Sequence, residues 1–240
     1  GKLGDIINSS AAYVGKPISD YPDTLETVTY SSFRTAQTGR TPMVYVGAND
    51  GMLHGFRADN GLEEIAYVPN LVYTNDATNN LSLLTWQSYT HRYYVDGSPT
   101  IGDVFYGGAW HTMLVGGLRK GGRGYYALDV TDPANFDQTK VLWEIDGSDA
   151  DIGKVISRPI ITKANNNAQV AIVSNGINST NGQPVLFVYN LQTGAVIARL
   201  IPAGPAADMD DNGLSAATGI DNNLDGKIDY VYAGDLKGNV

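Results

Sequence analysis

The chain has 240 residues, of which 42% are hydrophobic and 17% charged, so it has enough apolar material for one large core. Its formal net charge of -9 disfavours binding to nucleic acid or to anionic membranes, because acidic side chains repel phosphate groups. The absence of cysteine excludes a disulfide scaffold, a cysteine-rich zinc site and a thiol nucleophile. No apolar run approaches the roughly 20 residues that span a bilayer, and no signal peptide is visible.

In chain order, the sequence repeats a unit in which a short strand of small residues leads to three apolar strands joined by turns. In the first unit, residues 43–47 and 52–56 flank an Ala-Asn-Asp-Gly turn, and the second unit opens with Ser98-Pro99-Thr100. Four strands in a repeated unit are typical of a β-propeller blade. We therefore expect approximate blades at residues 8–69, 97–146, 156–201 and 214–240, the last of them truncated.

The repeats predict an all-β fold, a β-propeller of four-stranded blades with long inter-strand loops. Each unit exceeds the roughly 40–45 residues of a compact blade, and the surplus lies chiefly in the loops 15–42 and 71–95. Within the second loop, residues 81–86 could form a short helix. Three blades and part of a fourth do not close a ring, so we expect an incomplete propeller that belongs to a longer polypeptide. The alternative is a β-sandwich with uneven loops, which the repeats disfavour.

The sharpest local signal is the loop 221–229, in which oxygen-bearing side chains occupy the first, third, fifth and ninth positions. Alternate residues of a tightly wound loop can point inward, and Ca²⁺ prefers a flexible shell of oxygen ligands. Gly226 at the sixth position permits a sharp turn, and Lys227 would offer its backbone carbonyl. The sequence therefore predicts a calcium site with the ligands Asp221, Asn223, Asp225, Lys227 and Asp229.

The calcium loop departs from an EF-hand in two ways. The twelfth position is Tyr232 instead of glutamate, and residues 228–232 alternate as a strand does. Mg²⁺ suits the loop less well, because it requires octahedral geometry and retains its waters. The alternative is a polar turn without metal. The neighbouring acid-rich stretch 208–213 lacks the spacing, so we expect a solvated loop there.

The sequence presents no catalytic constellation. The histidines His54, His91 and His111 are isolated and lack metal-ligand spacing, so we expect structural roles for them. The basic, glycine-rich stretch 116–124 has no phosphate-loop ending and is better explained as a hairpin loop. No serine stands in a nucleophile elbow. We expect that the protein is not an enzyme.

Five motifs together resemble the C-terminal domain of the PilY/PilC family of type IV pilus biogenesis factors and tip-associated adhesins. They cover nearly the whole chain and occur in the family's order, at residues 4–10, 46–56, 95–99, 123–133 and 232–239. The resemblance implies a modified β-propeller. It also implies a calcium loop at the positions given above, with Lys227 contributing through its backbone.

The resemblance further implies a calcium-binding surface module that regulates pilus extension against retraction, twitching motility and adhesion. The partners it implies are pilins, minor pilins and host or surface ligands, and the location is outside the cell, at the bacterial surface, outer membrane or pilus tip. Two alternatives stay open. One is a quinone-dependent dehydrogenase propeller, disfavoured by the lack of a cysteine pair and of a regular tryptophan pattern. The other is an integrin-like adhesion propeller, which usually repeats its calcium loop in several blades.

Overall fold

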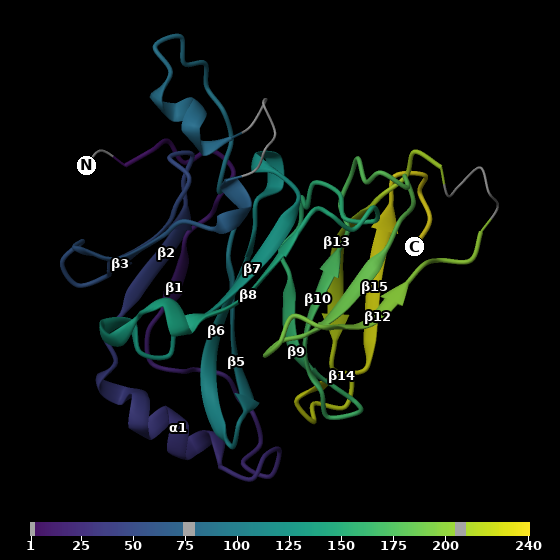
Figure 1. The fold of residues 1–240 in the computed structure, drawn as a ribbon. Coiled ribbons are helices and arrows are strands. Elements are labelled where there is room, and N and C mark those ends of the chain that lie inside the picture. Colours follow the sequence, from purple (N-terminus) through teal and green to yellow (C-terminus); the bar gives the residue numbers. More distant parts are fainter. Residues whose placement is uncertain (1–2, 74–79, 205–209) are drawn as a thin grey trace.

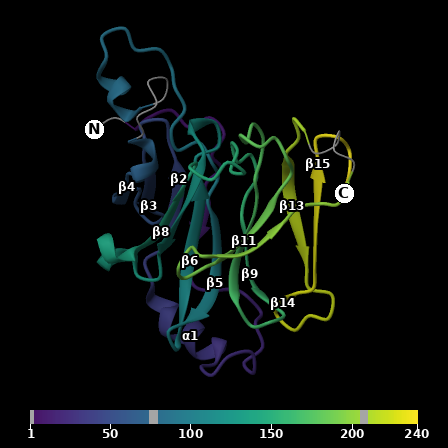
Figure 2. The same ribbon diagram turned by 45° about the vertical axis from the view of Figure 1, so that its right-hand side comes forward.

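A computed structural model describes residues 3–73, 80–204 and 210–240, and it is built almost entirely of antiparallel β-sheets that stand side by side (Figures 1 and 2). The first two sheets have four strands each, joined in sequence order, and they lie within the ranges expected for the first two blades. Their strands are β1 (Ala12–Val14), β2 (Met43–Gly47), β3 (Leu53–Arg57), β4 (Glu63–Tyr67), β5 (Thr100–Tyr106), β6 (Ala109–Gly117), β7 (Gly124–Asp129) and β8 (Val141–Asp146).

The third sheet has five strands in the order β12-β11-β10-β9-β14, and the fourth has only β13 and β15. Their bounds are β9 (Ile160–Ala164), β10 (Gln169–Ser174), β11 (Leu186–Asn190), β12 (Val196–Leu200), β13 (Leu214–Ile220), β14 (Lys227–Ile228) and β15 (Tyr230–Asp235). The all-β class and the incomplete propeller of four-stranded blades are thus confirmed. Short helices occupy the loops: α1 (Tyr30–Ala36) and 3₁₀ turns at Gln37–Gly39, Asn70–Val72, Leu81–Thr85, Arg119–Gly121, Pro133–Asn135 and Gln138–Lys140.

The core lies between the sheets, and each inner sheet is buried on both faces. Strand β6 shows this most clearly. Leu114 packs in the cluster shared with the first sheet, whereas Met113 and Val115 pack in the cluster shared with the third. Successive strand residues point to opposite faces, so a strand between two cores needs an uninterrupted apolar run.

Helix α1 lies in the first long loop, below the sheets in Figure 1, and was not anticipated from the sequence. The Thr29 hydroxyl caps it by accepting a hydrogen bond from the Ser32 N–H at 3.3 Å. Tyr30 and Phe33, three residues apart on one face, are buried against Trp110 of the second sheet. A helix of seven residues is marginal alone, so this aromatic packing holds it.

The starts of successive blades approach neighbouring backbone very closely. A Cβ on Gly47, at the end of β2, would lie 2.3 Å from the carbonyl oxygen of Val95, just before the second blade. One on Gly213, just before β13, would lie 2.0 Å from the carbonyl oxygen of Gly176, just after β10. Only glycine fits at such separations. Gly47 and Gly213 therefore set how tightly the first blade meets the second and the third blade meets the fourth.

Asn175 is fully buried and joins the third blade to the fourth. Its amide nitrogen donates to the carbonyls of Asp151 (3.0 Å) and Gln183 (2.8 Å), and its oxygen accepts from the N–H groups of Val185 and Leu214, both at 3.1 Å. All four bonds of the side-chain amide reach backbone groups. One side chain thus satisfies polar groups that the junction would otherwise bury alone.

We expect Asn175→Ala to lower the free energy of unfolding by about 2–4 kcal/mol, because four buried backbone groups would lose their partner. Urea denaturation measures the loss. The matched control is Asn60→Ala, since exposed Asn60 makes one turn bond, to the Leu62 N–H at 2.9 Å, and its loss should cost about 0.5 kcal/mol. Equal losses in the two variants would contradict this account of the junction.

The histidines have structural partners, of which His54 is the most buried. Its Nε2 lies 3.0 Å from Asp50 and its Nδ1 lies 2.5 Å from Glu63, while Asp50 also accepts the Gly4 N–H at 2.7 Å. The hydrogen bond with Asp50, aided by that with Glu63, raises the pKa of His54 although burial opposes it. The other histidines also contact carboxylates, in the pairs His91–Asp5 and His111–Asp129.

A raised pKa means that the charged His54 stabilises the fold. This contribution is complete below the unfolded value of about 6.5 and is lost as the pH rises through the higher folded value. We expect His54→Gln to be most destabilising below about pH 6.5 and progressively less so above it. Thermal unfolding from acidic to mildly alkaline pH measures the difference, with the exposed His91→Gln as the control. A pH-independent difference would exclude this linkage.

Candidate metal site

The predicted calcium loop connects strands that belong to different sheets. It leaves β13 after Ile220 and enters β14, whose Lys227 and Ile228 pair in parallel with β9, opposite Lys163 and Ala164. The sequence predicted one continuous strand here. Instead the chain changes sheets at Asp229, so that β14 extends the third sheet and β15 pairs with β13.

The side chains of two predicted ligands, Asp221 and Asn223, stabilise the turn of the loop through hydrogen bonds to its backbone. The Asp225 N–H is shared between Asp221 Oδ1 at 3.2 Å and Asn223 Oδ1 at 3.1 Å. The second oxygen of Asp221 accepts the Gly226 N–H at 2.8 Å. Leu224 and Gly226 have positive φ angles of 59° and 84°, which wind the loop tightly.

The ninth position closes the loop from the other side. Asp229 Oδ2 accepts the Asn222 N–H at 2.8 Å, and the Asp229 N–H donates to the Ile220 carbonyl at 2.9 Å. The Asp225 carboxylate in turn accepts the Lys227 N–H at 2.9 Å. The structure thus gathers all five predicted residues into one compact turn.

The residue types fit a hard cation: three carboxylates, an amide oxygen and a backbone carbonyl in one loop. Their carboxylates bond to backbone N–H groups of the loop, and Asp229 also accepts a hydrogen bond from the Asn165 side-chain amide at 3.4 Å. Within residues 3–73, 80–204 and 210–240, no three His, Cys, Asp or Glu side chains stand close enough to share one ion. The loop therefore brings suitable donors together, and binding would require the carboxylates to turn toward a common centre.

The loop is covered by a segment from the start of the chain. Tyr21, with Asp221, Gly226 and Lys227, lines a small cavity of about 210 Å³. Burial, and then the negative charges of Asp103 and Asp221, raise the pKa of Tyr21 to about 12. The phenol stays neutral at physiological pH and closes one side of the loop. This neighbour lies some 200 residues away in sequence, so no local pattern could have predicted it.

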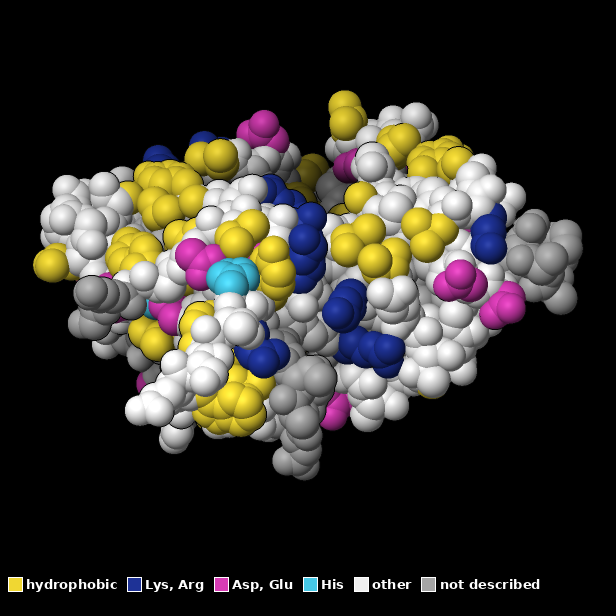
Figure 3. Space-filling view, turned by 90° about the horizontal axis from the view of Figure 1, so that it is seen from above, with side chains coloured by type: hydrophobic (Ala, Val, Ile, Leu, Met, Phe, Trp, Pro, Cys, Tyr) yellow, Lys and Arg dark blue, Asp and Glu magenta, His cyan; other side chains and the backbone are white. Residues whose placement is uncertain are grey.

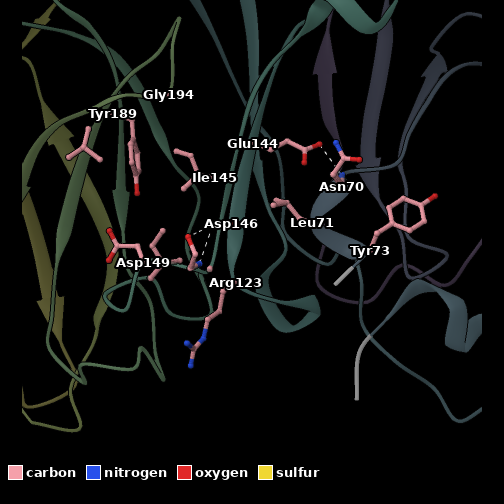
Figure 4. A pocket seen from close by; sticks show the side chains of 14 residues that line it. Asn70, Leu71, Tyr73, Arg123, Glu144, Ile145, Asp146, Asp149, Tyr189 and Gly194 are labelled. Carbon is pink, nitrogen blue, oxygen red and sulfur yellow. Dashed lines mark hydrogen bonds between the residues drawn. The ribbon is translucent and has the colours of Figure 1, made fainter. Parts of the chain in front are cut away.

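A groove of about 760 Å³ lies between β8 and the third sheet (Figure 4). Its carboxylates are occupied: Glu144 accepts the Asn70 N–H at 3.0 Å, Asp146 accepts the Ser148 N–H at 3.1 Å, and Asp149 is paired with Arg199. These bonds stabilise turns and blade contacts. No local sequence pattern could indicate the groove, because residues from three blades or their connections line it.

The basic stretch 116–124 forms the connection between β6 and β7, as predicted. Arg119 donates to the Asn8 carbonyl, Lys120 lies over the Tyr93 ring, and Arg123 donates to the Asn178 carbonyl. Figure 3 looks down on the end of the molecule opposite α1 and shows basic side chains interspersed with apolar and acidic ones. These cations serve internal contacts in the fold.

Part of the acid-rich stretch, Asp208 and Met209, lies outside the described residues. Of the remainder, Asp210 and Asp211 are exposed, whereas Asn212 is buried, with its Oδ1 accepting the Leu236 N–H at 2.9 Å. Thus the end of this stretch anchors the fourth sheet. Within the described ranges, no helix combines the length and apolar character needed to cross a bilayer.

Comparison with known proteins identifies the fold's relatives. The family model of the PilY1 beta-propeller domain matches residues 3–240. The type IV pilus biogenesis factor PilY1 of Pseudomonas aeruginosa PAO1 is 46% identical over 242 residues, which cover 99% of this chain and 20% of that protein. A PilY1 homolog of Xylella fastidiosa is 41% identical over 257 residues, covering 100% of this chain and 17% of the homolog.

Among solved structures, the crystal structure of the P. aeruginosa PilY1 C-terminal domain superimposes with a TM-score of 0.78 at 42% identity. The match covers 95% of this chain and 44% of that one. The chain therefore spans only 20% of the length of its curated P. aeruginosa PAO1 relative. The resemblance drawn from the motifs is confirmed: this chain belongs to the PilY1 β-propeller family of type IV pilus biogenesis factors.

Proposed function

We propose that this domain binds one Ca²⁺ through the side chains of Asp221, Asn223, Asp225 and Asp229 and the backbone carbonyl of Lys227. The observation that supports this most is the wound loop that brings these five residues into one turn. Bound calcium would supply positive charge among three carboxylates, which otherwise repel one another. Asp221 and Asp225 would orient the ion from the loop, and Asp229 would face them from the strand exit.

We further propose that calcium occupancy regulates the pilus machine to which this family belongs, shifting the balance of pilus extension and retraction and so twitching motility and adhesion. The partners would be pilins and minor pilins together with host or surface ligands, and the location would be the bacterial surface, outer membrane or pilus tip. Family membership supports the link to pilus biogenesis.

A non-catalytic role is part of the proposal. The relatives are pilus biogenesis factors. In the groove beside β8, the carboxylates Glu144, Asp146 and Asp149 already form hydrogen bonds or an ion pair within the fold. A carboxylate that already caps a turn or pairs with arginine is poorly placed to exchange protons with a substrate. This favours a binding module over a quinone-dependent dehydrogenase.

Asp225→Asn tests the ligand assignment, because it removes one negative charge and keeps the side-chain size. We expect one saturable Ca²⁺ site in the unmodified chain, and an affinity lower by about tenfold or more in the variant. Titration calorimetry measures both, with Mg²⁺ as the competing ion. Glu64→Ala is the matched control, since it removes an exposed carboxylate on β4, far along the chain from the loop, and should leave the affinity unchanged. Equal affinities for Asp225→Asn and the unmodified chain would refute the assignment.

A further inference from the structure

The segment between β1 and α1 crosses from the first blade to the third. We refer to residues 20–29 as the crossing segment. Its Glu26 carboxylate lies 2.5 Å from the Lys163 ammonium on β9 and accepts a bond from the Gln169 amide at 3.0 Å. Lys163 also donates to the Leu25 carbonyl at 3.3 Å. In Figures 1 and 2 this part of the chain runs below the sheets beside α1, and the β13–β14 loop lies at the same end of the molecule.

The ion pair between Glu26 and Lys163 is protected from water. The two side chains are only 12% and 5% exposed. Breaking a buried pair by removing one partner leaves an uncompensated charge and is strongly destabilising. The pair therefore fixes the crossing segment on β9 much more firmly than a surface ion pair would.

The crossing segment also presses on the candidate calcium loop. A Cβ on Gly226 would lie 3.1 Å from Leu25 Cδ2 and 3.2 Å from Tyr21 Cδ1. Asp225 and Lys227 line a second small cavity together with Leu25 and its neighbours in the crossing segment. Two predicted ligand positions thus form a surface with this segment, and Leu25 and Tyr21 lie directly against the turn at Gly226.

The remainder of the crossing segment is anchored on the second blade. Trp110 Nε1 donates to the Val28 carbonyl at 2.7 Å, and the Tyr21 ring stacks on Trp110 with centroids 5.4 Å apart. Immediately beyond it, the Tyr30 hydroxyl donates to Asp103 at 2.5 Å. The segment is therefore clamped between the calcium loop and the aromatic cluster under helix α1.

From these contacts we propose that Tyr21, Glu26 and Lys163 are positioning residues for the calcium loop, and that calcium occupancy is coupled to the order of the crossing segment. This inference rests on the proposed calcium site. Lys163 joins the two elements directly, because its backbone pairs with Lys227 at the loop exit while its side chain holds Glu26.

The coupling has a simple physical origin. The carboxylates of Asp221, Asp225 and Asp229 now bond to the N–H groups of the loop, so turning them toward an ion changes how the loop is wound. The loop packs against Tyr21 and Leu25, and its new shape must fit that surface. Coupling between two sites is reciprocal. If the crossing segment favours the calcium-bound conformation of the loop, calcium binding must in turn favour the ordered conformation of the crossing segment.

The test combines titration calorimetry with amide hydrogen exchange on the 240-residue chain, using CaCl₂ as the probe. We expect calcium to slow exchange in residues 20–29 of the unmodified chain. Glu26→Gln keeps the side-chain size but removes the charge, and it should weaken calcium binding by about fivefold or more and reduce this slowing. Lys163→Met should act in the same direction, whereas Lys163→Arg keeps the charge and should restore most of the affinity.

Arg199→Met is the matched control. It removes the ion pairs between Arg199 on β12 and Asp149 and Asp151 in the connection after β8. Strand β12 is at the opposite edge of the third sheet from β14, so the variant should lower stability without altering calcium affinity. The coupling is refuted, and the calcium site is retained, by the following result. The unmodified chain binds calcium, Glu26→Gln binds it with the same affinity, and calcium does not change hydrogen exchange in residues 20–29. If the unmodified chain binds no calcium, the proposed function fails and the coupling fails with it.

Discussion

The close approach of backbone at the blade junctions is the constraint on which the rest of the domain depends. Gly47 and Gly213 each meet a carbonyl of a neighbouring blade at a distance that no side chain could occupy. Asn175 satisfies the polar groups buried beside Gly213. These contacts set the separation of adjacent sheets. At that separation, the apolar faces of adjacent sheets pack against each other. The loops at the ends of the strands are then held against the same neighbouring loops.

Much of the fold could be predicted because its signals are local. Apolar strands, glycine turns and their repetition depend on residues close in sequence, and they indicated the blades and the 3₁₀ turn at Leu81–Thr85. Helix α1 escaped prediction because its seven residues owe their stability to Trp110, which is distant in sequence. The switch of sheets at Asp229 was also missed, since the pairing of β14 with β9 is a tertiary event.

The candidate site divides in the same way. The oxygen donors from Asp221 to Asp229 lie within nine consecutive residues, so the loop and its turn at Gly226 could be predicted from the sequence. Its surroundings could not, because Tyr21, Leu25 and Lys163 come from other blades. Sequence patterns indicate which groups can bind an ion. Only the folded chain reveals what limits their movement, and hence what else moves when they rearrange.

The ion pair between Glu26 and Lys163 joins residues 137 positions apart, and this separation has a consequence for how the domain assembles. During synthesis the crossing segment emerges before its partner on β9, which appears only after the second blade is complete. Closing so long a loop costs chain entropy before the contact returns any stability. The underside of the domain, with the loop from Asp221 to Asp229, should therefore be the last region to acquire native structure, after the first two blades have folded.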